Sequence, residues 1–159
     1  MSSDCSGGGK IASCLQTEGH AGRLADMAIA RIDTRLDAEP DQVWALLQRA
    51  DTLTHIARPL VVFRPVDPPQ LPEIWSAGEY IVSMWIFGVL PFGRQTVGIE
   101  FHDSHPEAPV GARLLRDNGS GQMIRRWDHW IFVSRHPEGG TAYTDRVEIR
   151  AGLLTPGVW

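Results

Sequence analysis

Side chains alternate strictly along the chain just after Met27. In "AIARIDTRL" one alternate set is mostly apolar and the other mostly charged, which predicts a strand over residues 29–37 with one face in water. The period then changes to helical spacing, with an apolar stripe made of Val43, Trp44, Leu46 and Leu47. Pro40 suits the first helical position. Residues 51–57 predict a second short helix, for which Asp51 would be the cap.

From residue 60 onward the pattern predicts strands almost exclusively. The expected turns contain glycine or proline, as in "GVLPFG" (88–93), "NGSG" (118–121) and "HPEGG" (136–140). The last two strands form a long hairpin over the third of these turns. The six expected strands cover residues 60–66, 78–87, 94–101, 112–117, 122–135 and 141–150.

This order predicts an α+β domain in which two short helices follow the first strand of a curved antiparallel sheet of about seven strands. Two short helices cover only part of a concave apolar face. The segment "AGLLTPGVW" places Thr155 as a helix N-cap and Pro156 at the first helical position, so we expect a C-terminal helix that is truncated after Trp159. Residues 1–26 are expected to be a flexible extension, and residues 27–159 to form the domain.

Composition narrows the classes of function. A chain of 159 residues with 43% hydrophobic and 21% charged side chains suits one globular domain. The net charge of −4 gives no basic excess, so we expect no nucleic-acid partner. The longest apolar run, residues 84–92, is far shorter than the ~20 residues that cross a bilayer, so no stable membrane insertion is expected. Cys5 and Cys14 are expected to be free thiols in a reducing cytoplasm.

Several segments resemble a known superfamily. "DAEPDQVWALL" is similar to its first-helix signature, while "IFGVLPFG", "RDNGSGQMIRRWDHWIFV" and "GGTAYTDRVEIRAGLLTP" resemble a small stand-alone bacterial branch. The superfamily is the helix-grip (SRPBCC) group of START domains, birch-pollen allergen-type proteins and polyketide cyclase/dehydrase-like proteins. The resemblance implies a long C-terminal helix held by the sheet, and a deep apolar cavity that binds a lipid, polyketide or other hydrophobic molecule.

The hairpin "RRWDHWIFV"/"AYTDRVEI" carries the densest mix of polar and aromatic side chains. One register places Trp127 and His129 toward the core, and the other places Trp130 and Phe132 there, since a shift of one residue reverses the face. His129 beside Asp145 could act as an oriented general base in an aromatase/cyclase or dehydratase. The competing interpretation is a half-buried sheet histidine, with Asp145 paired to a neighbouring arginine.

We therefore expect a non-catalytic or weakly catalytic protein that binds a small hydrophobic molecule, and no cofactor. Dimerisation through an uncovered apolar face is a further hypothesis. The segment "HDSH" (102–105) is expected to be a surface loop and not a metal site. The expected ligand contacts are aromatic side chains and one arginine on the β-rich half: Trp85, Phe87, Arg126, Trp127, Trp130, Phe132 and Tyr143.

Overall fold

The protein is described here from a computed structural model that covers residues 27–150. The predicted N-terminal extension and the predicted helix start at Thr155 lie outside the described residues. In the described part, no helix is both long enough and apolar enough to cross a membrane.

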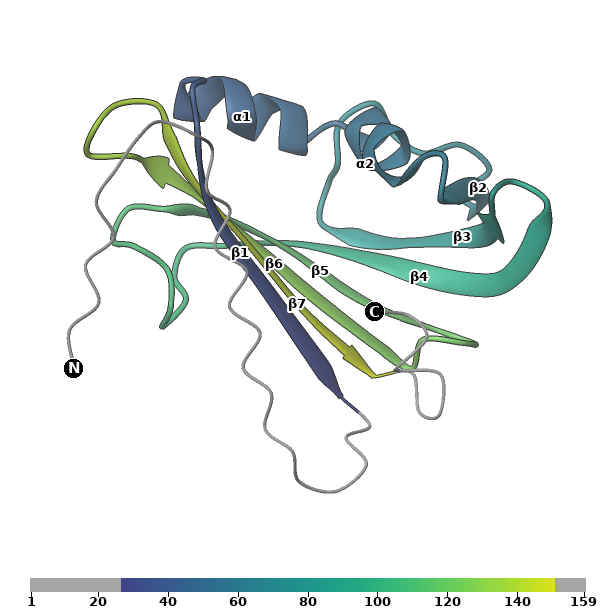
Figure 1. The fold of residues 1–159 in the computed structure, drawn as a ribbon. Helices are drawn as coiled ribbons and strands as arrows, with labels where there is room; N and C mark the ends of the chain where they lie inside the picture. Colours follow the sequence, from purple (N-terminus) through teal and green to yellow (C-terminus); the bar gives the residue numbers. More distant parts are fainter. Residues whose placement is uncertain (1–26, 151–159) are drawn as a thin grey trace.

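Seven antiparallel strands form one curved sheet, and two short helices follow the first strand, which confirms the predicted α+β class (Figure 1). Strands β2 to β7 run as a meander, and β1 lies beside β7, so the order across the sheet is β1-β7-β6-β5-β4-β3-β2. The elements are β1 (Ala28–Leu36), α1 (Pro40–Leu47), α2 (Ala50–Ala57), β2 (Val61–Asp67), β3 (Gly78–Ile86), β4 (Leu90–His102), β5 (Arg113–Gly121), β6 (Arg126–Arg135) and β7 (Thr141–Arg150).

The helices carry the chain from one edge strand of the sheet, β1, to the other, β2 (Figure 1). Helix α1 begins at Pro40 as predicted, because the fixed φ of proline suits a position whose N–H needs no helical partner. Helix α2 begins one residue before Asp51, so the prediction that Asp51 is its N-cap is wrong. The Asp51 carboxylate instead binds the Arg49 guanidinium, with N···O distances of 2.7 and 3.0 Å.

The register of the strands settles which side chains face the helices. On β6, Ile131 and Val133 pack with Val43 of α1, so Trp127 and His129, at the same parity, lie on this inner face. The alternate residues Trp130 and Phe132 lie on the opposite, outer face, where they form a separate cluster with Leu114. Of the two registers that the sequence allowed, the structure has the first.

Two apolar clusters make up the inner face. One lies beneath α1 and includes Leu115, Ile131 and Val133. The other lies toward α2 and the β3–β4 half of the sheet, and it reaches Trp127 and Val147 on β6 and β7. The two helices lie over only part of this face (Figure 1).

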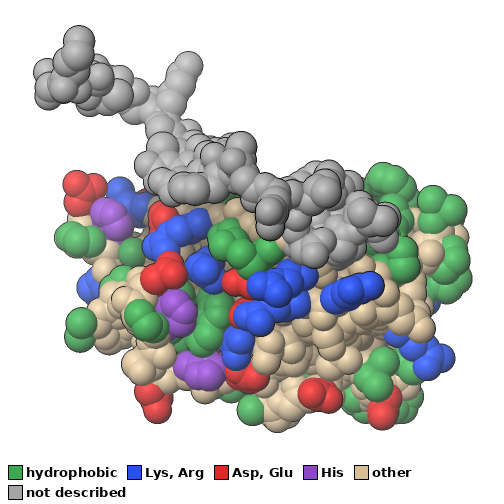
Figure 2. Space-filling view, turned by 90° about the horizontal axis from the view of Figure 1, so that it is seen from below, with side chains coloured by type: hydrophobic (Ala, Val, Ile, Leu, Met, Phe, Trp, Pro, Cys, Tyr) green, Lys and Arg blue, Asp and Glu red, His purple; other side chains and the backbone are tan. Residues whose placement is uncertain are grey.

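The outer face carries charged side chains in an ion-pair network. Arg116 binds both carboxylate oxygens of Asp128, at 2.8 and 2.9 Å, and Arg126 binds one of them at 2.7 Å. Figure 2 shows this face, where basic, acidic and histidine side chains gather side by side. Burial alone would raise the pKa of Asp128, but the two arginines outweigh it and hold that pKa below its usual value.

The segment "NGSG" (118–121) is part of strand β5, so the prediction of a turn there is wrong. The chain turns instead between Gly121 and Arg126. The glycines have a packing role: a Cβ on Gly119 or Gly121 would lie 2.5 Å from a backbone oxygen of β4. Their missing side chains leave the space that the Gln95 side chain occupies on the inner face.

Candidate functional site on the inner face

Four polar side chains converge on the inner face, and we call Asp117, His129, Tyr143 and Asp145 the polar band. The His129 Nε2 atom lies 2.8 Å from Oδ1 of Asp145, and the Tyr143 hydroxyl donates to Oδ2 of the same carboxylate at 3.3 Å. The structure therefore brings together the two residues that the sequence predicted as a catalytic pair, together with one of the predicted ligand contacts.

The strand register explains this convergence. Asp145 of β7 lies opposite Ile131 of β6, and His129 lies two positions along β6 on the same face. Such diagonal neighbours on adjacent strands are within reach of a long side chain. Asp117 of β5 lies directly opposite His129, which brings a third strand into the polar band.

The pair fixes the orientation of the imidazole. A carboxylate only accepts hydrogen bonds, so Asp145 holds the Nε2 proton of a neutral His129 and leaves the lone pair on Nδ1. Burial, reinforced by the charge and hydrogen bond of Asp145, raises the pKa of Tyr143. Tyr143 therefore keeps its proton and remains a donor to Asp145 over the whole neutral range.

Asp117 is the carboxyl group with the most perturbed acidity in the described residues. Burial raises its pKa to about 6, although the Gly98 N–H donates to its Oδ1 atom at 2.9 Å, and Trp127 and His129 also act to lower the pKa. A carboxyl group with this pKa exchanges its proton close to neutrality, which is the property that acid–base catalysis and pH-dependent binding use.

Apolar side chains flank the polar band on both sides. Along β6, His129 lies between Trp127 of one apolar cluster and Ile131 of the other, and along β7 Asp145 is followed by Val147. The side chains of His129 and Asp145 are 18% and 28% exposed, so solvent reaches both. A few convergent polar groups within an apolar surface are typical of sites for small molecules.

Gln95 adds a buried polar group to the same face. Its side chain is 6% exposed, and neither its Oε1 nor its Nε2 atom has a hydrogen-bond partner among the described residues. The Nε2 atom and Oδ1 of Asp117 both lie within 3.4 Å of the point where a Cβ on Gly119 would stand. The Gln95 amide is therefore next to the polar band.

Five of the predicted ligand contacts lie away from this site. Trp130 and Phe132 are on the outer face, where the His105 ring packs on both, with centroid distances of 4.4 and 5.1 Å. Arg126 is also there, bound to Asp128. Their prediction as contacts of one ligand with Trp127 and Tyr143 does not fit the register, because the two sets face opposite sides of β6 and β7.

The other two are on the β3 side of the molecule. Trp85 lies under the guanidinium of Arg64, whose Cζ atom is 4.1 Å from the ring centroid. A β-bulge shifts the pairing with β4 between Met84 and Trp85, and of these two residues only Met84 is buried in the core. Phe87 follows the end of β3 and is 63% exposed. Neither side chain contributes to the polar band.

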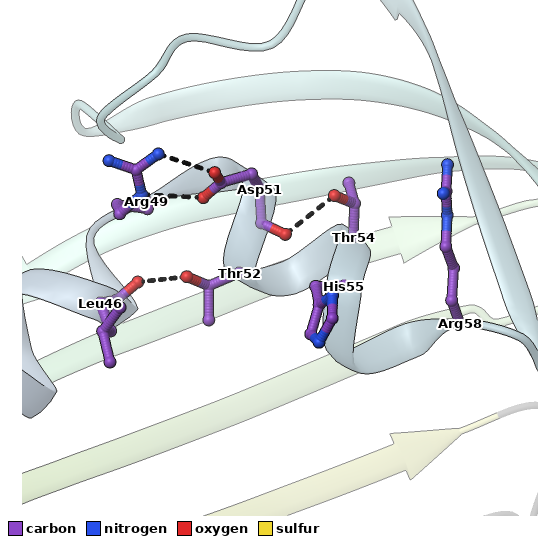
Figure 3. Close-up of a pocket in the computed structure, with 7 residues that line it drawn as sticks. All are labelled: Leu46, Arg49, Asp51, Thr52, Thr54, His55 and Arg58. Carbon is purple, nitrogen blue, oxygen red and sulfur yellow. Dashed lines mark hydrogen bonds and ion pairs between the residues drawn. The ribbon is translucent and has the colours of Figure 1, made fainter.

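A hollow of about 540 Å³ lies beside α2 and is distinct from the polar band (Figure 3). Most of its polar groups are already paired with one another: Arg49 binds Asp51, and the Thr52 hydroxyl donates to the Leu46 carbonyl at 2.6 Å, which leaves His55 and Arg58. This pairing leaves few unused polar groups for a ligand, so we do not place the functional site there. The lining residues are Leu46, Arg49, Asp51, Thr52, Thr54, His55 and Arg58.

Sequence reasoning missed Asp117 and Gln95. Asp117 was expected at the end of a strand because the glycines after it resemble a turn, yet its parity with Leu115 was a usable signal. In residues 27–150, which include the "HDSH" segment, no group of three or more His, Cys, Asp or Glu is arranged to hold a metal ion. His102 of this segment binds Glu100 on the outer face, at 2.9 Å.

Comparison with known proteins gives the fold alone. No protein-family model and no curated protein matches the chain. Among solved structures, protein CV1439 from Chromobacterium violaceum is similar with a TM-score of 0.54 and 14% sequence identity, over 82% of this chain and 85% of that chain. The Mll3558 protein from Rhizobium loti has a TM-score of 0.44 and 12% identity, over 77% and 80% of the two chains. The curved sheet with its two helices is thus an arrangement that this chain shares with CV1439 from Chromobacterium violaceum.

Proposed function

We propose that the protein binds a small hydrophobic molecule, such as a lipid or a polyketide, between the inner face of the sheet and its helices. The observation that carries the proposal is the polar band, in which His129 and Asp145 are 2.8 Å apart between two apolar clusters. The apolar surface would supply affinity at ~25 cal/mol per Å² buried. The polar band would orient a hydroxyl or carbonyl group of the ligand.

The helix-grip arrangement is part of this proposal. The described order of one strand, two helices and six strands supports it, and so does an inner face that α1 and α2 cover only in part. In that arrangement a long helix crosses the remaining inner face and closes the cavity. The assignment predicts that a ligand contacts Trp127 and Tyr143, which lie on this face.

Two measurements test the binding proposal. Native mass spectrometry of the freshly purified full chain should show a co-purified apolar molecule. Titration with prodan, a naphthyl ketone fluorophore, should give a blue-shifted emission that saturates. The absence of a co-purified molecule together with the absence of saturable prodan binding would contradict the proposal.

Matched variants locate the binding site. His129→Leu leaves the Asp145 carboxylate without its imidazole partner beside the apolar surface and should weaken prodan binding about tenfold, which corresponds to ~1.4 kcal/mol. His102→Leu breaks a comparable histidine–carboxylate pair on the outer face and should leave prodan binding unchanged. Equal losses in both variants would place the probe elsewhere.

The geometry of the His129–Asp145 pair favours a second candidate function, an enzyme that removes a proton next to a carbonyl group. Nδ1 of His129 would take the proton, and Asp145 would stabilise the resulting imidazolium. An aromatase/cyclase or dehydratase needs this enolisation step.

Hydrogen–deuterium exchange into α-tetralone, followed by NMR, measures the enolisation step directly. Wild-type protein should accelerate the exchange, His129→Leu should abolish the acceleration, and His102→Leu should retain it. Saturable prodan binding without any acceleration of exchange would leave the binding function and remove the enzymatic one.

A further inference from the structure

Four exposed apolar side chains gather at the end of the molecule where β3 turns into β4. They are Leu60, Phe87, Val89 and Leu90, each between 57% and 70% exposed, and we call them the apolar tip. The backbone holds its two segments together, because the Phe87 N–H donates to the Leu60 carbonyl at 2.9 Å and Val61 pairs with Ile86. Figure 2 shows hydrophobic side chains gathered at the corresponding end of the molecule.

The backbone at the turn is itself unusual. Phe87 has a φ of 49°, the only positive value for a residue other than glycine in the described chain. This left-handed conformation is unfavourable for a residue with a bulky side chain. The fold therefore presents a large aromatic ring to solvent at a conformational cost, which is typical of residues kept for an interaction.

The charges around the tip are all positive. Residues 55–66 and 84–95 contain three arginines, Arg58, Arg64 and Arg94, and no Asp or Glu, although the whole chain has a net charge of −4. The next turn adds Arg125, since the Gln122 N–H donates to the Arg94 carbonyl at 3.1 Å. None of these four arginines forms an ion pair with another residue in 27–150.

We propose that the apolar tip docks the protein reversibly onto an anionic lipid surface. Exposed aliphatic and aromatic side chains would enter the headgroup boundary, while the surrounding arginines would contact lipid phosphates and carboxylates. The Arg64 guanidinium lies at the apolar tip, because its Nη2 atom donates to the Gly88 carbonyl in the turn, at 3.4 Å. This inference concerns a surface separate from the polar band and does not depend on the proposed function.

Charge favours a membrane over a second copy of the chain. In a symmetric dimer the same patch meets itself, which would place the arginines of the two copies against one another without acidic partners. An anionic bilayer provides the complementary charge across the whole tip. Binding is expected to weaken as salt screens the attraction.

Vesicle co-sedimentation of the full chain tests this proposal. The protein should sediment with vesicles of phosphatidylcholine mixed with phosphatidylserine, much less with phosphatidylcholine alone, and less at high salt. Val89→Ser should reduce the bound fraction several-fold, whereas Val110→Ser, at a still more exposed valine in the loop after β4, should not. Arg94→Gln should lower the affinity about fivefold, whereas Arg113→Gln, which removes the partner of Asp41, should not.

Two results would overturn the proposal. One is that the wild-type protein stays in the supernatant with anionic vesicles, or that all variants sediment to the same extent as the wild type. The other is a dimer in light scattering that Val89→Ser converts to a monomer, which would make the tip an interface between copies of this chain. Circular dichroism of each variant shows whether reduced binding comes from the changed surface or from unfolding of the protein.

Discussion

Gln95 places an amide in the core without hydrogen-bond partners in the described structure. Leaving a polar group unpaired in a buried position costs about 1–3 kcal/mol, whereas an apolar group of the same shape would not pay that penalty. The position is surrounded by the core residues Val82 and Val97, which contact an apolar side chain more favourably. The unpaired Gln95 amide therefore lowers the free energy of unfolding, and a role in ligand binding would explain why a polar residue occupies this position.

Gln95→Met is expected to raise the free energy of unfolding by about 1–2 kcal/mol, because the side chain keeps its length and loses its unpaired amide. Urea denaturation followed by tryptophan fluorescence measures the change. Gln42→Met, on the exposed surface of α1, is the control and should change stability little. A destabilised Gln95→Met protein would mean that the amide is paired in solution.

Asp117 makes stability depend on pH. Its folded pKa of about 6 lies above the ordinary value of 3.8, so the folded state binds the proton more tightly. The contribution of Asp117 to stability is therefore largest while its carboxyl group is protonated, and this contribution is lost as pH rises from about 4 to about 6.

Asp117→Asn removes this dependence and keeps an oxygen that can accept the Gly98 N–H. The variant should gain stability over the wild type as pH rises through that interval, and the gain should level off at no more than about 3 kcal/mol near pH 7. Thermal unfolding across the pH range gives the difference curve. Asp103→Asn, in an exposed loop, should give a flat curve, and a flat curve for Asp117→Asn would contradict the raised pKa.

At the scale of elements, local signals predicted α1 and β7 well, because Pro40, the apolar stripe after it and the alternation of residues 141–150 need no information from elsewhere in the chain. The segment 118–121 was predicted wrongly for the opposite reason. Its glycines are typical of a turn, but here they make room for Gln95 from a neighbouring strand. The His129–Asp145 pair was predictable from residue type, whereas its face became clear only from the register.

Gly119→Ala tests the strand at 118–121. The new Cβ would lie 2.5 Å from the Thr96 carbonyl oxygen, so the neighbouring strands would have to separate, and we expect a loss of about 1–3 kcal/mol in unfolding free energy. Ser120→Ala, at an exposed position of the same strand, should be nearly neutral. Equal small effects in chemical denaturation would instead agree with a flexible turn.

At the scale of the whole molecule, the sheet joins strands that are far apart in sequence. Ala28 of β1 pairs with Ile149 of β7, while every other strand pairs with its neighbour along the chain. Closing such a long loop costs entropy before any contact is gained, and sheets rich in non-local pairs fold slowly.

Refolding of the full chain from urea should accordingly take on the order of milliseconds to seconds. Stopped-flow tryptophan fluorescence measures the rate. Ile32→Ala, on the β1 strand opposite Asp145, should chiefly speed unfolding if β1 docks after the transition state. Refolding within microseconds would contradict the expectation.

The pairing of β1 with β7 also matters while the ribosome is making the chain. The β1 segment emerges long before its partner has been translated, so its backbone donors and acceptors stay available to neighbouring nascent chains. Arg31, Asp33 and Arg35 place charges on alternate positions of this segment, and charged side chains discourage the intermolecular pairing that leads to aggregates. The alternation that marks the first strand thus protects the protein during its own synthesis, before that strand has a place in the sheet.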